Sequence, residues 1–504
     1  LPASMILDSM TPSNDPASPS CASGTLECFE GMRVEISNGA VTGGNQGFGS
    51  DPVAEVFVTA ADSRTFREPG VSYPGLGGLI PTWDGNPEVF EMDPDKLGLP
   101  SLIIAGGSSF TASGVIGFEY GDYELWPTSL DVTPAVLPRE VRSKNSGETT
   151  VGSFNLFRFA TDGEYSTRLS KLSLYIRNVL KSPDILAVQE VDGIGALQDL
   201  ADTIALDDSS VSYTAHLVEG NDIGGIDVGY LVRSEVKVDS TTQFGKDEMF
   251  SYDGSLLHDR PPLLLEGRYT GNGRDFPLAV LVVHNRSLNG IDTERVQLKR
   301  LTQAESIAQM VQTYQSNNPN TPLIVVGDFN AYEFTDGYAD IVGHIKGDFN
   351  PAESVKSGLD LVNPNLTNQV DLLPASERYS FVFQGNAQAL DHALTSQSAA
   401  PWVRGLQYGR GNADAAKSLL DDPSTAVRSS DHDGLVVFLM TDFDGDGVGD
   451  DADSCPANDR LVVQDPENGC VTPIPTLGPL GLLLMLIVLG GVGMLALRPQ
   501  YVLK

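Results

Sequence analysis

The stretch Leu323-Ile324-Val325-Val326-Gly327-Asp328-Phe329-Asn330 decides the fold of this chain. Its first four residues are apolar, and three of them are β-branched, which predicts a buried strand. The strand ends in a glycine followed by two polar side chains, Asp328 and Asn330. Open α/β sheets place their functional groups at the ends of their strands. The stretch therefore predicts an α/β domain with a site at one rim of its sheet.

The sequence on both sides of this strand alternates between apolar strands and helical patterns. Leucine, isoleucine and valine recur at helical spacing between positions 169 and 179, and a second helix is expected from about Thr293 to Gln315. Further strands are expected at Ile185–Val188, Leu278–Val283 and Leu435–Leu439. We assign residues 147–441 to this one α/β domain.

Several of the strands end in acidic, amide or imidazole groups. These groups are Asn155, Glu190, Asp328 with Asn330, Asp391 with His392, and Asp431 with His432. Each could instead be a turn or cap residue, since Asp and Asn favour such positions. Carboxylate and amide oxygens without a thiolate suit a hard cation such as Mg²⁺, and a His–Asp pair can activate water. Together these groups predict the hydrolysis of phosphodiesters, in which a metal ion neutralises phosphate charge.

The motifs FNLF, QEV, GDFN, LDHAL and SSDHDGL occur in this order between Val151 and Thr441. This set resembles the endonuclease/exonuclease/phosphatase superfamily with its deoxyribonuclease-like fold. The resemblance implies a four-layer α/β sandwich. It also implies that Glu190 and Asn155 hold Mg²⁺ or Mn²⁺, and that Asp328 and Asn330 orient the phosphate and the attacking water.

The resemblance assigns the histidines as well. Asp391 would pair with His432, which acts as general base or phosphate contact, and Asp431 would assist the metal or the histidine. His284 resembles the second catalytic histidine, and Asp227 is our candidate for its acidic partner. His392 has no role in the motif, and we expect it to be structural or at the rim.

Residues 28–136 precede the α/β domain and predict short strands separated by turns, at 32–36, 56–58, 102–104, 118–120 and 123–125, the last two around a Gly121-Asp122 turn. The run from Cys28 to Val34 and the aromatic run from Phe118 to Pro127 resemble the OB-like β domain of bacterial extracellular nucleases. OB-folds bind single strands through aromatic faces and a basic groove, yet this domain has few cations, so its aromatics could equally serve packing. Residues 1–27 are interpreted as a linker or a truncated N-terminal segment.

The segment 442–471 begins with aspartates at alternating positions, ending at Cys455. Alternating carboxylates with a turn glycine suit an oxygen cage for Ca²⁺, and the spacing resembles a thrombospondin type 3 repeat. The calcium candidates are Asp442, Asp444, Asp446, Asp450 and Asp453. An acidic, solvated linker is the alternative.

Residues 474–504 begin with Ile474-Pro475-Thr476-Leu477 and contain an uncharged stretch from Gly478 to Leu497, followed by Arg498. The stretch is long enough for a transmembrane helix, and its cationic end favours a cytoplasmic C-terminus. A buried core helix is the alternative. The whole segment resembles the C-terminal sorting signal of Gram-negative bacteria, which implies export and possible removal by a sorting protease. A permanent membrane anchor remains the other interpretation.

The four cysteines form two local pairs, Cys21 with Cys28 and Cys455 with Cys470, which favours disulfides and an oxidising compartment. The formal net charge of -35 predicts weak nonspecific affinity for nucleic acid, but a metal at the site can bridge to phosphate. We expect an exported, metal-dependent, sequence-nonspecific nuclease acting on DNA or RNA. A lipid or inositol-phosphate phosphodiesterase and an inactive calcium-dependent surface protein are the alternatives.

Overall fold

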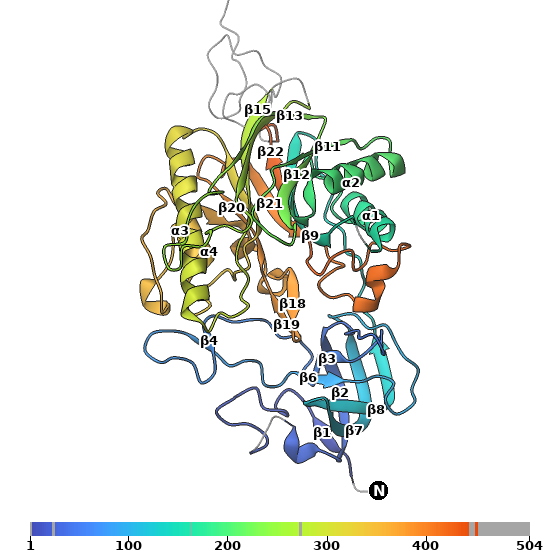
Figure 1. Cartoon of the computed structure of the whole chain (residues 1–504). Coiled ribbons are helices and arrows are strands. Elements are labelled where there is room, and N and C mark those ends of the chain that lie inside the picture. The colour runs from blue at the N-terminus through green and yellow to red at the C-terminus, as the bar shows by residue number, and fades with distance from the viewer. Residues whose placement is uncertain (1–2, 23–25, 162, 272–274, 443–448, 452–504) are drawn as a thin grey trace, which may run out of the picture. The chain divides into compact units, whose positions relative to one another are not determined.

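The computed structural model describes residues 3–22, 26–161, 163–271, 275–442 and 449–451. The chain divides into two units, Leu1–Met440 and Thr441–Lys504. The first unit contains two six-stranded mixed sheets flanked by helices and a separate six-stranded sheet, five strands of which close into a barrel (Figure 1).

The two sheets of the α/β domain carry the helices on their outer faces. The first sheet has the order β11 (Tyr213–Leu217), β12 (Asp227–Arg233), β10 (Ile185–Val191), β9 (Glu148–Phe159), β22 (Leu435–Met440) and β21 (Val403–Tyr408). The second has the order β13 (Val236–Gln243), β14 (Leu263–Tyr269), β15 (Phe276–His284), β16 (Leu323–Asp328), β20 (Asp391–Thr395) and β17 (Thr367–Asn368). The helices are α1 (Tyr165–Leu174, continued by a π-helical turn over Tyr175–Val179), α2 (Gly193–Asp207), α3 (Glu294–Asn317) and α4 (Ile341–Lys346).

Three apolar cores hold these elements in four layers, as the resemblance implies. One core lies between the inner faces of the two sheets. The second joins the first sheet to α1 and α2, and the third joins the second sheet to α3 and α4. The strands expected at 185–188, 278–283, 323–326 and 435–439 and the helix expected at 293–315 are all present. These strands lie inside their sheets, which explains their continuous apolar sequences.

The N-terminal sheet closes into a five-stranded barrel. Its strands are β2 (Arg33–Gly43), β3 (Val56–Thr59), β6 (Phe90–Met92), β8 (Asp122–Thr133) and β7 (Ser109–Glu119), and β7 pairs again with β2. Strand β1 (Met5–Leu7) adds to β2 in parallel, and β4 (Val71–Ser72) pairs with β5 (Thr82–Trp83) outside the barrel. Short 3-10 helices cover Glu27–Phe29 beside the barrel and Pro351–Glu353, Gln369–Leu372, Ala375–Glu377 and Lys417–Asp421 in the α/β domain.

The barrel corrects three of the sequence predictions. Residues 1–27 are not simply a linker, because β1 joins the sheet and Leu7, Cys21 and Leu26 are buried in the barrel core. Residues 102–104 form no strand. The hairpin of β7 and β8 turns at Tyr120-Gly121 rather than at Gly121-Asp122, since both turn residues have positive φ and Glu119 pairs with Asp122.

A short hairpin of the α/β domain contacts the barrel region. It consists of β18 (Phe381–Phe383) and β19 (Asn386–Gln388). The Ala387 N–H donates to Thr65 O at 3.2 Å, and the Arg67 N–H donates to Ala387 O at 2.9 Å. Arg64 of the same segment forms a 2.9 Å ion pair with Asp414. The barrel segment and the hairpin therefore share backbone hydrogen bonds.

The expected disulfide between Cys21 and Cys28 is present. The Cys455–Cys470 pair and the stretch 478–497 lie outside the described residues. Among the residues that are described, no helix has the length and apolar character needed to cross a membrane.

Candidate active site

Strand register brings three of the predicted side chains together. His284 at the end of β15 pairs with Asp328 at the end of β16, and Asp328 pairs with Asp391 at the start of β20. Paired residues on adjacent strands project from the same face of a sheet. The three groups therefore lie side by side at one rim of the second sheet.

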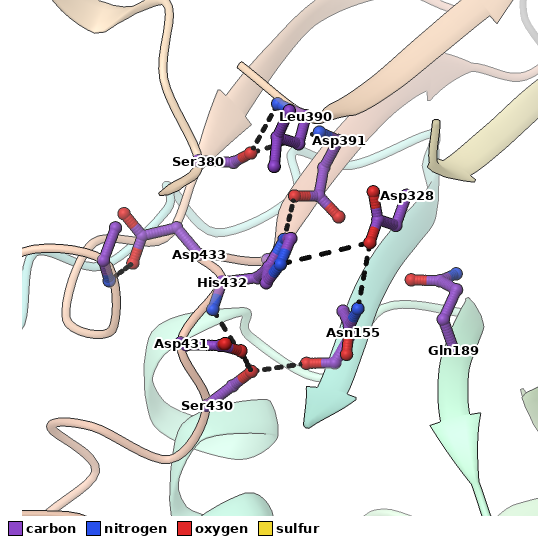
Figure 2. A network of polar contacts seen from close by, with 12 residues as sticks. Asn155, Gln189, Asp328, Ser380, Leu390, Asp391, Ser430, Asp431, His432 and Asp433 are labelled. Carbon is purple, nitrogen blue, oxygen red and sulfur yellow. Dashed lines mark hydrogen bonds and ion pairs between the residues drawn. The ribbon is translucent and has the colours of Figure 1, made fainter. Parts of the chain in front are cut away.

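The first sheet contributes Asn155 and Glu190 to the same rim. Glu190 lies at an irregularity in the β9–β10 register and has φ 60°, a conformation that turns its side chain out of the regular alternation. The Asn155 side-chain amide donates to Glu190 Oε1 at 3.2 Å and to Asp328 Oδ2 at 3.1 Å. Asn155 thus connects the two carboxylates from opposite sheets, and its bond to Asp328 is drawn in Figure 2.

The GDFN motif places Asp328 through a tight backbone arrangement. Gly327 has φ 146°, and a Cβ atom there would lie 2.0 Å from Val283 O, so only glycine fits. Asn330 has φ 49°, its N–H donates to Asp328 Oδ1 at 2.7 Å, and its side-chain amide donates to Asp328 Oδ2 at 3.1 Å. Both oxygens of Asp328 are therefore oriented, and the positive φ of Asn330 brings its N–H and its side chain to the same carboxylate.

The Asp391–His432 pair predicted from the motifs is present. His432 Nδ1 lies 2.7 Å from Asp391 Oδ2, and His432 Nε2 lies 4.0 Å from Asp328 Oδ2 (Figure 2). Burial alone would lower the pKa of His432, but the charges of Asp391 and Asp328 outweigh it and hold that pKa well above its usual range. The protonated imidazole of His432 is therefore favoured beside the carboxylates of Asp391 and Asp328.

His284 lies on the other side of Asp328. Its Nε2 is 3.6 Å from Asp328 Oδ2 and 3.8 Å from Glu190 Oε1. Burial, together with the positive charges of Arg260 and His432, lowers the pKa of His284 well below its usual range. His284 is therefore a neutral imidazole, in contrast to His432.

The proposed partnership of Asp227 with His284 is corrected. Asp227 accepts a 2.8 Å hydrogen bond from the Gly220 N–H, and burial together with Glu219 raises its pKa. Nδ1 of His284 is buried without a hydrogen-bond partner among the described residues. Asp227 instead holds the backbone N–H of Gly220.

Two groups at this rim have the geometry of a cation site. Ligand atoms of Glu190, His284 and Asp328 lie within 4.8 Å of one another, as do those of Asp328, Asp391 and His432. The first group offers two carboxylates from opposite sheets and a neutral imidazole, a donor set that fits Mg²⁺ or Mn²⁺. Asp431 belongs to neither group, and its Oδ1 lies 3.4 Å from the Ser430 hydroxyl.

Three residues that shape the SSDHD loop, Asp433, Arg410 and Asn412, were not among the predicted site residues. Asp433 is buried, pairs with Arg410 at 3.2 Å and accepts the N–H groups of Gly411 and Asn412. The Asn412 side chain donates to His432 O at 2.8 Å. The opposite charges of Arg410 and Asp433 were the available signal, but their burial could not be seen in sequence. His392 is buried and hydrogen-bonds Ala331 O, so it is structural.

Only two of the calcium candidates lie in the described residues. The Asp450 N–H donates to Thr441 O at 3.0 Å, and the Thr441 hydroxyl donates to Asp450 at 2.8 Å. Asp442 is also described, whereas Asp444, Asp446 and Asp453 lie outside the described residues. The calcium site stays a prediction.

The model of the endonuclease/exonuclease/phosphatase family matches residues 152–432, more than half of the chain. Among solved structures, humanized D. rerio TDP2 is similar at 18% identity and a TM-score of 0.39, covering 59% of this chain and 100% of that one. An endonuclease/exonuclease/phosphatase from Bacteroides vulgatus is similar at 13% and 0.39, covering 58% and 99%. The human Nocturnin catalytic domain is similar at 17% and 0.37, covering 59% and 96%. No curated protein matches the chain.

Proposed function

The chain belongs to the endonuclease/exonuclease/phosphatase family and is a hydrolase acting on phosphodiester bonds, and on that basis we propose that it is a metal-dependent, sequence-nonspecific nuclease. One observation carries the proposal: Glu190 and Asp328 face each other across the two sheets, beside the Asp391–His432 pair. Carboxylates hold a hard cation, and an imidazole held by a carboxylate moves protons. These are the groups that the hydrolysis of a phosphodiester requires.

Each group in the cluster has a distinct role in this proposal. Glu190 and Asp328 would hold Mg²⁺ or Mn²⁺, with Asn155 fixing both carboxylates, and the ion would neutralise charge on the phosphate. Asn330 holds Asp328 in place and orients the attacking water together with it. His432, held at Nδ1 by Asp391, presents Nε2 to the phosphate or to the proton that moves. Neutral His284 can accept or donate one hydrogen bond to the same phosphate or water. Asp431, in the SSDHD loop, would assist the metal or His432.

The test is a substrate panel with the full chain. Plasmid DNA, RNA, sphingomyelin and inositol phosphates are each incubated with Mg²⁺, with Mn²⁺ and with a chelator. We expect cleavage of DNA or RNA that requires the metal and is lost in Glu190→Ala. Cleavage of only the lipid or only the inositol phosphates would replace the nuclease proposal with the phosphodiesterase alternative. Turnover by Glu190→Ala equal to that of the wild type would reject the site assignment.

We also propose that the protein is exported from a Gram-negative bacterium and processed at its C-terminus. The Cys21–Cys28 disulfide supports an oxidising compartment, and the IPTL segment with its apolar stretch supports a sorting signal with a membrane-spanning intermediate. Mass spectrometry of protein from cells and medium tests this proposal. Extracellular protein that ends near residue 474 is expected, and protein retained in the cytoplasm would contradict export.

The N-terminal barrel is proposed to be an OB-like domain and the segment 442–471 a calcium repeat. Closure of five strands supports the first assignment, and the alternating aspartates support the second. Calorimetric titration of the full chain with Ca²⁺ tests the second, with Asp446→Asn as the comparison. Identical titrations for the wild-type chain and Asp446→Asn would reject the assignment of this segment as a calcium site.

A further inference from the structure

We propose that a single-stranded nucleic acid binds along the β18–β19 hairpin, with unpaired bases against Phe383 and Phe48 and phosphates near Lys417 and Arg428. This inference rests on the proposed nuclease function and specifies the form of its substrate. The surface lies outside the catalytic cluster.

The hairpin extends an aromatic surface outward from the catalytic histidine. The Phe381 ring lies 4.8 Å from the His432 ring, centroid to centroid. Phe383 is two residues further along β18, and residues two apart project from the same face of a strand. The Phe383 side chain is 57% exposed, which is unusual for a large apolar residue beside an active site. A base next to the cleaved phosphate would therefore meet an open aromatic ring.

A cavity of about 260 Å³ lies beside this hairpin, where the barrel and the α/β domain both contribute. Phe383 and Phe48 both line it, and Phe48 is also 54% exposed. The Lys417 ammonium lies 6.0 Å from the centre of the Phe48 ring. Aromatic faces next to cations are what sequence-tolerant single-strand binding uses.

Two cations line this cavity, the exposed Lys417 and the partly buried Arg428, whose charge is also attracted by Asp431 and Asp433. Lys417 Nζ donates to Gly47 O at 2.9 Å, and Arg428 Nη1 donates to Asn412 O at 3.0 Å. In the described part of the chain, neither forms an ion pair with a carboxylate. In a chain with 67 acidic and 32 basic residues, two such cations beside the active site mark a place where phosphate is tolerated. Arg428 also stands four residues before His432 in the same loop, which links the cavity to the catalytic site.

The barrel aromatics noted in the sequence are a poorer surface. Tyr120 is 95% exposed, but it sits between Glu119 and the Asp122 end of β8. The Trp126 indole N–H donates to Glu124 at 2.9 Å, so this ring is held in place by a hydrogen bond within the protein. Carboxylates around these rings would repel a phosphate backbone.

The experiment measures binding to the full chain in a Glu190→Ala background, which prevents cleavage. A fluorescent oligothymidylate and a duplex of equal length serve as probes, and anisotropy reports the affinity. We expect Phe383→Ala to weaken single-strand binding roughly 5- to 100-fold, because one stacking contact is lost. Phe383→Trp should restore it, since an indole also offers a stacking face.

Lys417→Gln should lower the slope of log affinity against log salt by about 1, because one phosphate contact is lost. Tyr120→Ala is the matched control, an exposed aromatic outside this surface, and it should bind as the parent does. The duplex should bind more weakly than the single strand, and its affinity should not change when Phe383 is substituted.

Three results would overturn the inference. The first is equal oligothymidylate affinity for Phe383→Ala and its parent. The second is a loss at Phe383→Ala that Phe383→Trp does not restore. The third is an effect of Phe383→Ala on binding to phosphatidylcholine vesicles but not to the oligonucleotide, which would assign these rings to a lipid surface. Plasmid cleavage by the wild-type chain is scored separately: no cleavage would reject the nuclease proposal, whereas cleavage with unaltered binding at position 383 would reject only this surface.

Discussion

The barrel and the catalytic rim each gather acidic ligand atoms within 4.8 Å of one another, yet different side chains surround these atoms. In the barrel, Glu55, Asp93 and Glu124 lie at a cavity of about 520 Å³. Burial, reinforced by neighbouring carboxylates, raises the pKa of Glu124 to about 7, so protonation relieves the repulsion there.

At the catalytic rim, burial likewise raises the pKa of Asp328 to about 7, but side-chain donors surround this carboxylate. Asn155 and Asn330 donate to Asp328, and the imidazole of His432 lies between Asp328 and Asp391. The comparison teaches that a group of carboxylates is not by itself a catalytic site. What distinguishes the rim is the set of amide and imidazole groups that orients its carboxylates.

The largest expected difference between the two regions is in catalysis. His432→Ala should lower kcat/KM for plasmid DNA with Mg²⁺ by about 10² to 10⁴, the usual contribution of a positioned acid–base group. Glu124→Gln, which alters the barrel cluster, should cleave at the wild-type rate. Initial rates of plasmid nicking are compared for the two variants. Equal losses of rate in both would contradict the proposed functional difference between the clusters.

A second expected difference between the two regions is the cost of replacing a glycine that has a positive φ. Gly327→Ala should lower the free energy of unfolding by about 4 kcal/mol or more, because the new Cβ meets Val283 O in addition to the strained φ. Gly121→Ala in the barrel hairpin also has a positive φ, but nothing lies within 4 Å of its Cβ position. Gly121→Ala should therefore lower the free energy of unfolding by only about 1–2 kcal/mol. Chemical denaturation measures both, and similar costs would show that the approach of Val283 is easily relieved.

The smallest difference is a pH effect in the barrel. The pKa of Glu124 is raised from 4.5 to about 7 on folding, so the folded protein binds a proton more tightly than the unfolded chain. This contribution to stability is complete below pH 4.5 and is lost as the pH rises through about 7. Glu124→Gln, which removes the titration, should therefore gain about 2–4 °C in Tm relative to wild type between pH 5 and pH 8. A constant Tm difference across this range would contradict the raised pKa.

Sequence reasoning predicted the α/β domain because its central strands are apolar runs that suit a doubly covered sheet. It also brought together the residues whose strand ends meet by register, such as Asp328 and Asp391. It could not reveal the support of the SSDHD loop, since Asp433 and Arg410 look like ordinary surface charges until their burial is known. Asp227 failed as a partner for His284 because proximity of two strands does not fix where a side chain points.

The backbone hydrogen bonds between the 65–67 segment and β19 have a consequence for dissecting the protein. Strands of three residues gain little stability from each other, so the hairpin depends on the N-terminal segment for part of its order. Phe381, which contacts His432, is carried by that hairpin. A truncation that begins at residue 147 would keep every catalytic side chain and still release the ring packed against one of them. We therefore expect a fragment that begins at residue 147 to hold Phe381 less firmly against His432 than the full chain does.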